Sequence, residues 1–241
     1  MKKYICLVLI FALTLLFCAC TSSDEVYETP TPLHSELYLT DCSQEQMLKY
    51  FEEIVLDMEY GTGDSTVVQK WCSPIRYSIN GNATEKDLEV LNNFFAQLNK
   101  VDGFPGIYAA TNNFEQNLTI SFLGKNDFKT LFSECINDED AYAATEFWYY
   151  NATNEIHTAR IGYRTDIAQS ERISILIEEI VNMLGISDTE LREDSIVYQY
   201  SNENTTLSDE DWVILKLLYN PRIKCGFNAQ ECSEIFGKLY Y

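Results

Sequence analysis

Histidine is almost absent from this chain: only His34 and His157 occur among its 241 residues. Two histidines so far apart in the sequence exclude a zinc site with three histidine ligands. Basic residues are scarce too, with 17 Lys and Arg against 37 Asp and Glu, and the formal net charge is −20. Neutralising a phosphate backbone requires many Lys and Arg side chains, so we expect no nucleic-acid partner.

Several familiar site motifs are also missing. There is no G-x-S-x-G nucleophile motif, and Gly61-Thr62-Gly63 lacks the Gly-Lys-Ser/Thr that completes a phosphate-binding loop. None of the eight cysteines has C-x-x-C spacing, which argues against a thiol redox motif or a zinc ribbon. Cys225 and Cys232 are close in the sequence, and we predict a disulfide between them.

The N-terminus carries an apolar run that is too short for a comfortable transmembrane helix. Lys2 and Lys3 precede this run, Tyr4 to Phe17, which has the length of a signal-peptide core. The run ends in Leu16-Phe17-Cys18-Ala19-Cys20, which resembles the lipoprotein box of bacterial lipoproteins.

This resemblance implies that residues 1–19 are a signal peptide and that Cys20 carries the lipid. Residues 20–40 contain Pro and Ser without periodicity and are predicted to be a flexible spacer. We therefore expect a protein that is lipid-anchored at the extracytoplasmic face of a bacterial membrane.

Residues 41–241 are predicted to form one α+β domain with a mixed β-sheet, because 46% of the chain is hydrophobic and helical and alternating patterns follow one another. Helices capped by Ser43, Thr84, Ser170 and Ser208 are expected. The predicted helices span residues 43–58, 84–100, 128–135, 170–184, 208–219 and 228–239, and the predicted strands span 71–79, 107–111, 118–123, 145–150 and 155–163.

The most informative motif lies at the end of the fourth of these helices, in residues 178–188, which read EEIVNMLGISD. It resembles the H-E-x-x-H-x-x-G-x-x-H/D motif of the metzincin branch of the zincin metalloproteases. In that register Glu178 and Asn182 occupy the positions of the first two zinc ligands. Glu179 occupies the position of the general base, and Asp188 that of the third ligand.

Neighbouring segments extend this resemblance. Gly185 stands where the family has its turn glycine, and residues 155–163 resemble the strand that precedes the active-site helix. Residues 195–198 resemble the Met-turn, with Val197 in place of methionine, and residues 207–219 resemble the closing helix of matrixin-like enzymes. The resemblance implies a zincin-like fold for the domain.

The chain is more closely similar to the bacterial domain of unknown function numbered 2927, from about Phe51 to about Cys232. That family brings no established activity. The similarity rests on several motifs in order: Trp71 before Pro74-Ile75-Arg76, the Glu178-Glu179 helix ending Leu184-Gly185, Asp194-Ser195-Ile196, Leu207-Ser208 with Asp211, and Leu218-Tyr219-Asn220-Pro221-Arg222.

The residues at the ligand positions do not favour zinc. Zinc prefers imidazole nitrogen and thiolate sulfur, whereas Glu178, Asn182 and Asp188 offer only carboxylate and amide groups. An oxygen-only set suits Ca²⁺, Mg²⁺ or Mn²⁺ better. We therefore expect no zinc and no resident cofactor, with an oxygen-ligated divalent cation as the alternative. The polar face of an ordinary amphipathic helix would have the same residues.

Three functions stay open at this point. The first is a non-catalytic module, a degenerate metalloprotease that binds an extracytoplasmic peptide, protein or cell-wall component. The second is a hydrolase with Glu179 as general base, with or without a metal at Glu178, Asn182 and Asp188. The third is a structural lipoprotein of envelope assembly. We expect the first, and hence no enzyme.

Overall fold

The computed structural model describes residues 42–56, 67–112, 114–133 and 141–239. All of them belong to one folded unit of α+β class, which confirms the predicted fold class. The predicted signal peptide, Cys20 and the whole predicted spacer lie outside the described residues, and so does His34. No helix among the described residues has the length and apolarity needed to cross a membrane.

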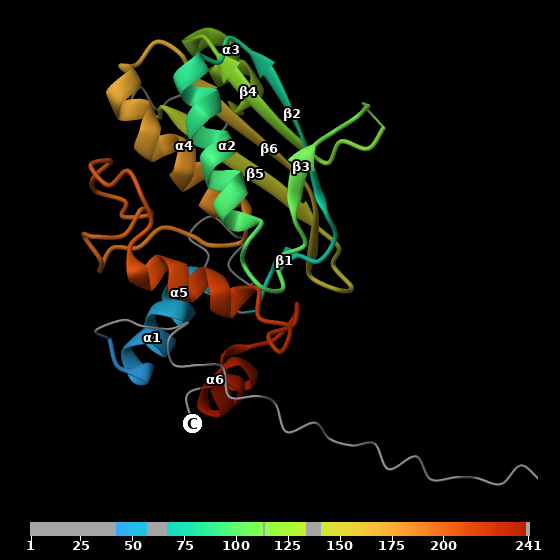
Figure 1. Cartoon of the computed structure of the whole chain (residues 1–241), viewed down its shortest axis with the longest axis vertical. Helices are drawn as coiled ribbons and strands as arrows, with labels where there is room; N and C mark the ends of the chain where they lie inside the picture. Colours follow the sequence, from blue (N-terminus) through green and yellow to red (C-terminus); the bar gives the residue numbers. More distant parts are fainter. Residues whose placement is uncertain (1–41, 57–66, 113, 134–140, 240–241) are drawn as a thin grey trace, which may run out of the picture. The chain divides into compact units, whose positions relative to one another are not determined.

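In the described part of the chain, six strands form one sheet (Figure 1). Five of them run in parallel in the order β1-β6-β4-β2-β3, and β5 pairs with β6 in antiparallel orientation. β5 is therefore an edge strand. The strands are β1 (Lys70–Trp71), β2 (Ile75–Gly81), β3 (Ile107–Ala109), β4 (Leu118–Leu123), β5 (Ala143–Tyr149) and β6 (Glu155–Arg164).

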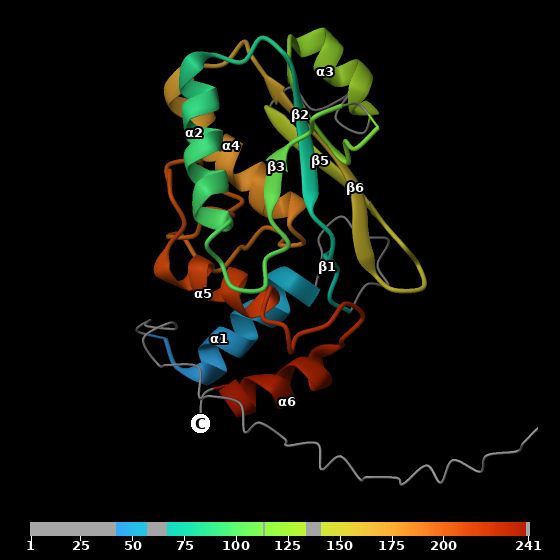
Figure 2. The same cartoon turned by 45° about the vertical axis from the view of Figure 1, so that its right-hand side comes forward.

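Helices cover both faces of the sheet. α2 and α4 pack side by side on one face, and α3 lies on the other, while α1, α5 and α6 gather at one end of the sheet (Figures 1 and 2). The helices are α1 (Gln44–Phe51), which continues as the π-helical turn η2 (Glu52–Leu56), α2 (Glu85–Leu98), α3 (Lys125–Leu131), α4 (Gln169–Met183), α5 (Asp209–Leu218) and α6 (Ala229–Leu239).

The side-chain alternation of β6 explains this layering. Tyr163 points toward α4, where its hydroxyl donates a hydrogen bond of 2.9 Å to the carbonyl oxygen of Leu176. The next position, Gly162, points to the opposite face, where a Cβ atom would lie only 2.3 Å from the ring of Phe132. Successive strand residues face opposite sides of a sheet, so β6 separates the two helical layers.

Three of the four predicted helix caps are confirmed. Ser43, Thr84 and Ser208 each accept a hydrogen bond from the backbone three residues later, as a capping box requires. The prediction for Ser170 is wrong, because α4 begins at Gln169 with Ala168 as its N-cap. There the carboxylate of Glu171 accepts a 3.3 Å hydrogen bond from the Ala168 N–H, and the Glu171 N–H donates one of 3.1 Å to the Ala168 carbonyl oxygen.

The predicted strand 71–79 is wrong as one element, since it divides into β1 and β2. Pro74 has no N–H to donate, so the ladder stops before it and resumes at Ile75. The predicted helix near 128–135 both begins and ends earlier, since α3 runs from Lys125, directly after the N-cap Gly124, to Leu131. The predicted strands 145–150 and 155–163 are found as β5 and β6, which pair in antiparallel orientation.

Two aromatic side chains hold the end of α4 against its surroundings. The indole Nε1 of Trp71 in β1 donates a 2.9 Å hydrogen bond to the carbonyl oxygen of Met183. The hydroxyl of Tyr219, directly after α5, donates one of 3.1 Å to that of Leu184. These bonds satisfy carbonyl groups that a helix end leaves without intrahelical partners. The last turn of α4 is thereby fixed in position.

Candidate functional site

α4 carries two of the predicted site residues, Glu178 and Asn182, on its less buried side. Ile180 and Met183 are completely buried, whereas Glu178 and Asn182 are partly exposed. Glu179 is 9% exposed, so its carboxyl group lies almost entirely inside the protein. The chain then turns at Gly185, whose φ is +97°.

The turn at Gly185 brings Asp188 back to α4. The side-chain nitrogen Nδ2 of Asn182 donates a 3.3 Å hydrogen bond to Oδ1 of Asp188. The other amide atom, Oδ1 of Asn182, is buried and has no hydrogen-bond partner within the described structure. Two of the residues at the predicted ligand positions therefore contact each other directly.

Glu179 is anchored to the edge strand. The hydroxyl oxygen of Thr145 in β5 lies 2.5 Å from Oε2 of Glu179 and 3.0 Å from the Glu179 carbonyl oxygen. The hydroxyl of Thr145 can donate to either oxygen, and because it has one proton it donates to only one of them at a time.

The surroundings of Glu178 and Glu179 raise the pKa of both carboxyl groups. Burial raises the pKa of Glu178 to about 9, and the negative charges of Glu179 and Asp188 add to this effect. Burial also raises the pKa of Glu179 to about 8, against the opposing effect of the Thr145 hydrogen bond. Both carboxyl groups are therefore mostly neutral at pH 7.

Tyr163 adds a further buried polar group beside this pair. Burial, together with the charges of Glu179 and Glu178, raises its pKa well above the ordinary value for tyrosine. No sequence motif indicates Tyr163 or Thr145 as a site residue. Thr145 lies 34 positions before Glu179, and no local pattern links residues at that distance.

The donor groups do not fit zinc. Zinc prefers imidazole nitrogen and thiolate sulfur over carboxyl and amide groups, and the nitrogen of the Asn182 amide, not its oxygen, faces Asp188. Within the ranges that the structure describes, no three His, Cys, Asp or Glu side chains are arranged to hold a metal ion. His157 lies on β6 and stacks on Tyr150, with their ring centroids 4.2 Å apart.

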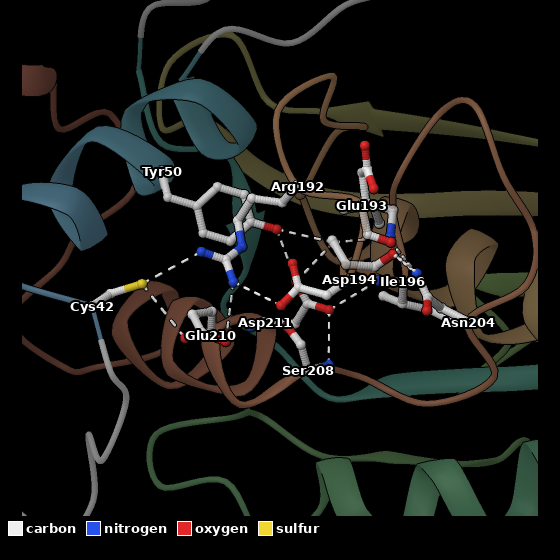
Figure 3. Close-up of polar contacts among 12 residues, drawn as sticks. Cys42, Tyr50, Arg192, Glu193, Asp194, Ile196, Asn204, Ser208, Glu210 and Asp211 are labelled. Atoms are coloured by element: carbon white, nitrogen blue, oxygen red, sulfur yellow. Dashed lines mark hydrogen bonds and ion pairs between the residues drawn. The ribbon is translucent and has the colours of Figure 1, made fainter.

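A buried carboxylate organises the turn of residues 195–198 (Figure 3). Asp211 of α5 accepts backbone hydrogen bonds from Ile196, at 2.9 Å, and Ser208, at 3.0 Å. The hydroxyl oxygens of Tyr50 and Ser195 each lie 2.8 Å from Oδ1 of Asp211. This network joins α1, α5 and the turn around one charge that is 4% exposed.

Arg192 and Asn204 extend the network in two directions, Arg192 beside Tyr50 and Asn204 away from it (Figure 3). The guanidinium of Arg192 forms ion pairs with Asp194, at 2.8 Å, and Glu210, at 3.2 Å. The side-chain nitrogen of Asn204 donates to the carbonyl oxygen of Ser195 at 2.7 Å. Sequence motifs identified none of these longer-range partners of the turn.

The turn is connected to the candidate site through the backbone. The N–H of Thr189, the residue after Asp188, donates a 2.8 Å hydrogen bond to the carbonyl oxygen of Val197. The position of Asp188 is therefore tied to the Asp211 network. A change in the Asp211 network can therefore alter the position of Asp188, although that network lies outside the candidate site.

The cysteines are arranged differently from the expectation. Cys225 and Cys232 form no disulfide in the structure, and Cys232 is completely buried on α6. The sulfur that faces Cys225 is that of Cys72, at 3.1 Å.

Comparison with known protein families places the described domain in a family of unknown function. A family model described as "Protein of unknown function (DUF2927)" matches residues 44–238. A search of curated proteins gives no significant match. The matched range includes the whole candidate site, the Asp211 network and all six strands.

Proposed function

Because the chain belongs to the DUF2927 family, whose function is unknown, we propose its function from the geometry around α4. We propose that this domain is a non-catalytic relative of metalloproteases that binds an extended peptide segment of an extracytoplasmic partner. The segment would lie along the edge strand β5, beside the exposed side of α4. Cys20 would hold the domain at the membrane through its lipid.

The observation that carries this proposal is the state of Glu179. A general base must be ionised and must reach a water molecule or substrate. Glu179 is nearly buried, its pKa is raised to about 8, and its carboxyl group contacts Thr145 at 2.5 Å. These properties favour a structural role that links α4 to β5 over a role in proton abstraction.

The edge strand supports peptide binding. Among the described strands β5 pairs with β6 alone, so one side of its backbone is not engaged in the sheet. Extended peptides bind such edges through backbone hydrogen bonds. Glu178 and Asn182 are partly exposed on the adjacent helix and can contact such a peptide through their side chains.

The test is a binding assay with a library of extended peptides, using the full chain in detergent. Glu178→Lys places a positive charge beside β5 and should weaken the bound peptides by at least about tenfold. Glu234→Lys makes the same change at an exposed position of α6 and is the matched control, expected to bind like wild type. Mass spectrometry of the eluted peptides should find them intact.

Two outcomes would contradict this function. If no peptide in the library binds, or if Glu178→Lys and Glu234→Lys bind equally, β5 and α4 are not the binding surface. Recovery of one stable membrane protein partner, unaffected by changes at Glu178, would instead favour a structural lipoprotein of envelope assembly.

A hydrolase is the second candidate, favoured by the raised pKa of Glu179. Buried carboxyl groups with a pKa near 8 occur among catalytic acids and bases. In the same assay a hydrolase would yield cleaved peptides, and Glu179→Gln would abolish the cleavage. Dialysis against zinc, calcium or manganese would then show stoichiometric metal that an Asn182→Ala and Asp188→Ala double variant loses. We expect neither cleavage nor bound metal.

A further inference from the structure

Two cysteines that are far apart in the sequence meet at one point of the fold. Cys72 is exposed and lies between β1 and β2, and Cys225 is half-buried between α5 and α6. Their Sγ atoms are 3.1 Å apart, although the residues are separated by 153 positions. A disulfide requires about 2 Å between the sulfurs, so only a small rotation of the side chains separates this pair from a bond.

The backbone on both sides of the pair is already fixed. Before Cys72, the N–H of Val68 donates to the carbonyl oxygen of Phe227, and the Val68 carbonyl oxygen accepts from Gly226, both at 2.8 Å. The ammonium group of Lys70 donates to the carbonyl oxygens of Leu218, at 2.6 Å, and Ile223, at 2.5 Å. The two segments therefore need no rearrangement for their cysteines to join.

We propose that Cys72 and Cys225 form a disulfide bond that fastens β1 to the segment between α5 and α6. Cys225 is then not available to Cys232, whose side chain is completely buried on α6. The bond is independent of peptide binding, because neither cysteine lies on β5 or α4.

The environment of the pair suits thiol–disulfide exchange. The hydrogen bond from the Cys72 thiol lowers the pKa of Cys225 to about 7, and contact with Lys70 acts in the same direction. The same hydrogen bond and burial raise the pKa of Cys72. Cys225 is therefore the cysteine of the pair that ionises more readily, and the thiolate is the nucleophile in exchange.

The reaction takes its oxidising power from a disulfide donor, either a small-molecule disulfide or a thiol oxidoreductase. The Cys225 thiolate attacks one donor sulfur, which forms a mixed disulfide and releases the other donor sulfur as a thiolate. Cys72 then loses its proton and attacks the sulfur of Cys225, which releases the second donor thiol. One donor disulfide is reduced to two thiols, and two cysteine thiols become one disulfide.

The bond would act on the fold next to the candidate site. Trp71, the neighbour of Cys72, donates the hydrogen bond that holds the carbonyl oxygen of Met183 at the end of α4. A disulfide at Cys72 therefore restrains β1, the strand whose Trp71 contacts the end of α4. Closing a loop of this length also restricts the unfolded chain strongly.

Peptide mapping of the full chain distinguishes the possible pairings. The reduced protein is equilibrated with a mixture of oxidised and reduced glutathione, its free thiols are alkylated, and it is digested with trypsin. Cleavage after Lys70 and Arg76 isolates Cys72 in residues 71–76, and cleavage after Lys224 and Lys238 leaves Cys225 and Cys232 together in residues 225–238. We expect the two fragments to appear as one cross-linked species that reduction separates.

Two variants identify the cysteine that is linked to Cys72. Cys232→Ser should retain the cross-linked species, and Cys225→Ser should lose it. The wild-type protein should also melt about 5–15 °C higher when oxidised than when reduced, a difference that Cys72→Ser abolishes. The proposal is overturned if Cys72 is alkylated throughout the redox titration, either with an internal Cys225–Cys232 bond in residues 225–238 or with all three thiols alkylated.

Discussion

Glu178 and Glu179 are adjacent carboxyl groups that the fold keeps neutral, and this has an energetic consequence. Glutamate ionises near 4.5 in an unfolded chain, whereas the pKa values of these residues in the folded protein are about 9 and about 8. Between pH 4.5 and pH 9 the folded state therefore binds more protons than the unfolded state. The free energy of unfolding must fall as the pH rises through this range.

Replacement of Glu178 by Gln tests this linkage, because an amide of the same shape has no proton to lose. Glu178→Gln should match wild type near pH 4.5 and should exceed its free energy of unfolding by about 1–3 kcal/mol at pH 8.5. Urea unfolding at both pH values gives the comparison. Glu234→Gln, an exposed change on α6, is the control and should follow the wild-type profile. If both variants follow it, Glu178 is ionised in the folded protein.

At the scale of elements, sequence patterns correctly predicted the features that depend on neighbouring residues. Capping boxes at Ser43, Thr84 and Ser208 and the strands β4 and β6 depend on residues a few positions apart, and the structure confirms them. The missed features depend on distant partners. The hydrogen bond of Thr145 to Glu179 joins two elements, and its partner is determined only when β5 packs on α4.

Part of the candidate site could likewise be predicted from the sequence, and part could not. Residues 178–188 could be located from their resemblance to a motif, and the structure brings Asn182 and Asp188 into contact. Burial of the carboxyl groups could not be predicted, because one helical periodicity is compatible with either a solvated or a covered polar face. The pKa values, and therefore the preference for a non-catalytic role, depend on that burial.

The end of α4 gives a prediction at this scale. Gly185 has a φ of +97°, and a Cβ atom there would lie 2.1 Å from the carbonyl oxygen of Gln69. Gly185→Ala combines an unfavourable backbone conformation with a steric clash against the segment before β1. It should reduce the free energy of unfolding by about 2–4 kcal/mol in urea titrations.

Gly237 provides the matched control for that variant. It lies within α6, and no atom lies within 4 Å of the Cβ that alanine would add. Gly237→Ala should therefore be neutral or should stabilise the protein by up to about 1 kcal/mol, because alanine favours the helix. Equal effects of the two substitutions would mean that the turn at Gly185 tolerates a side chain and does not fix Asp188.

At the scale of the whole molecule, the net charge of −20 limits how the protein can associate with a membrane. An anionic membrane surface attracts clusters of Lys and Arg and repels a body with an excess of Asp and Glu. No helix among the described residues is suited to cross a bilayer. Lipid on Cys20 is the anchor that we propose, and a single acyl chain binds only marginally whereas several bind stably.

This leads to a prediction that separates a lipid anchor from electrostatic adsorption. Wild-type protein should sediment with bacterial membranes and stay there in about 1 M salt, because screening does not weaken the burial of acyl chains. Cys20→Ser should abolish incorporation of a labelled fatty acid into the protein. The processed variant protein should also be absent from washed membranes. Cys18→Ser leaves Cys20 and Ala19 in place and should retain both the label and the sedimentation. Release of the wild-type protein by salt, or equal labelling of the two variants, would show that Cys20 is not the anchor, because either result requires a contact elsewhere in the chain.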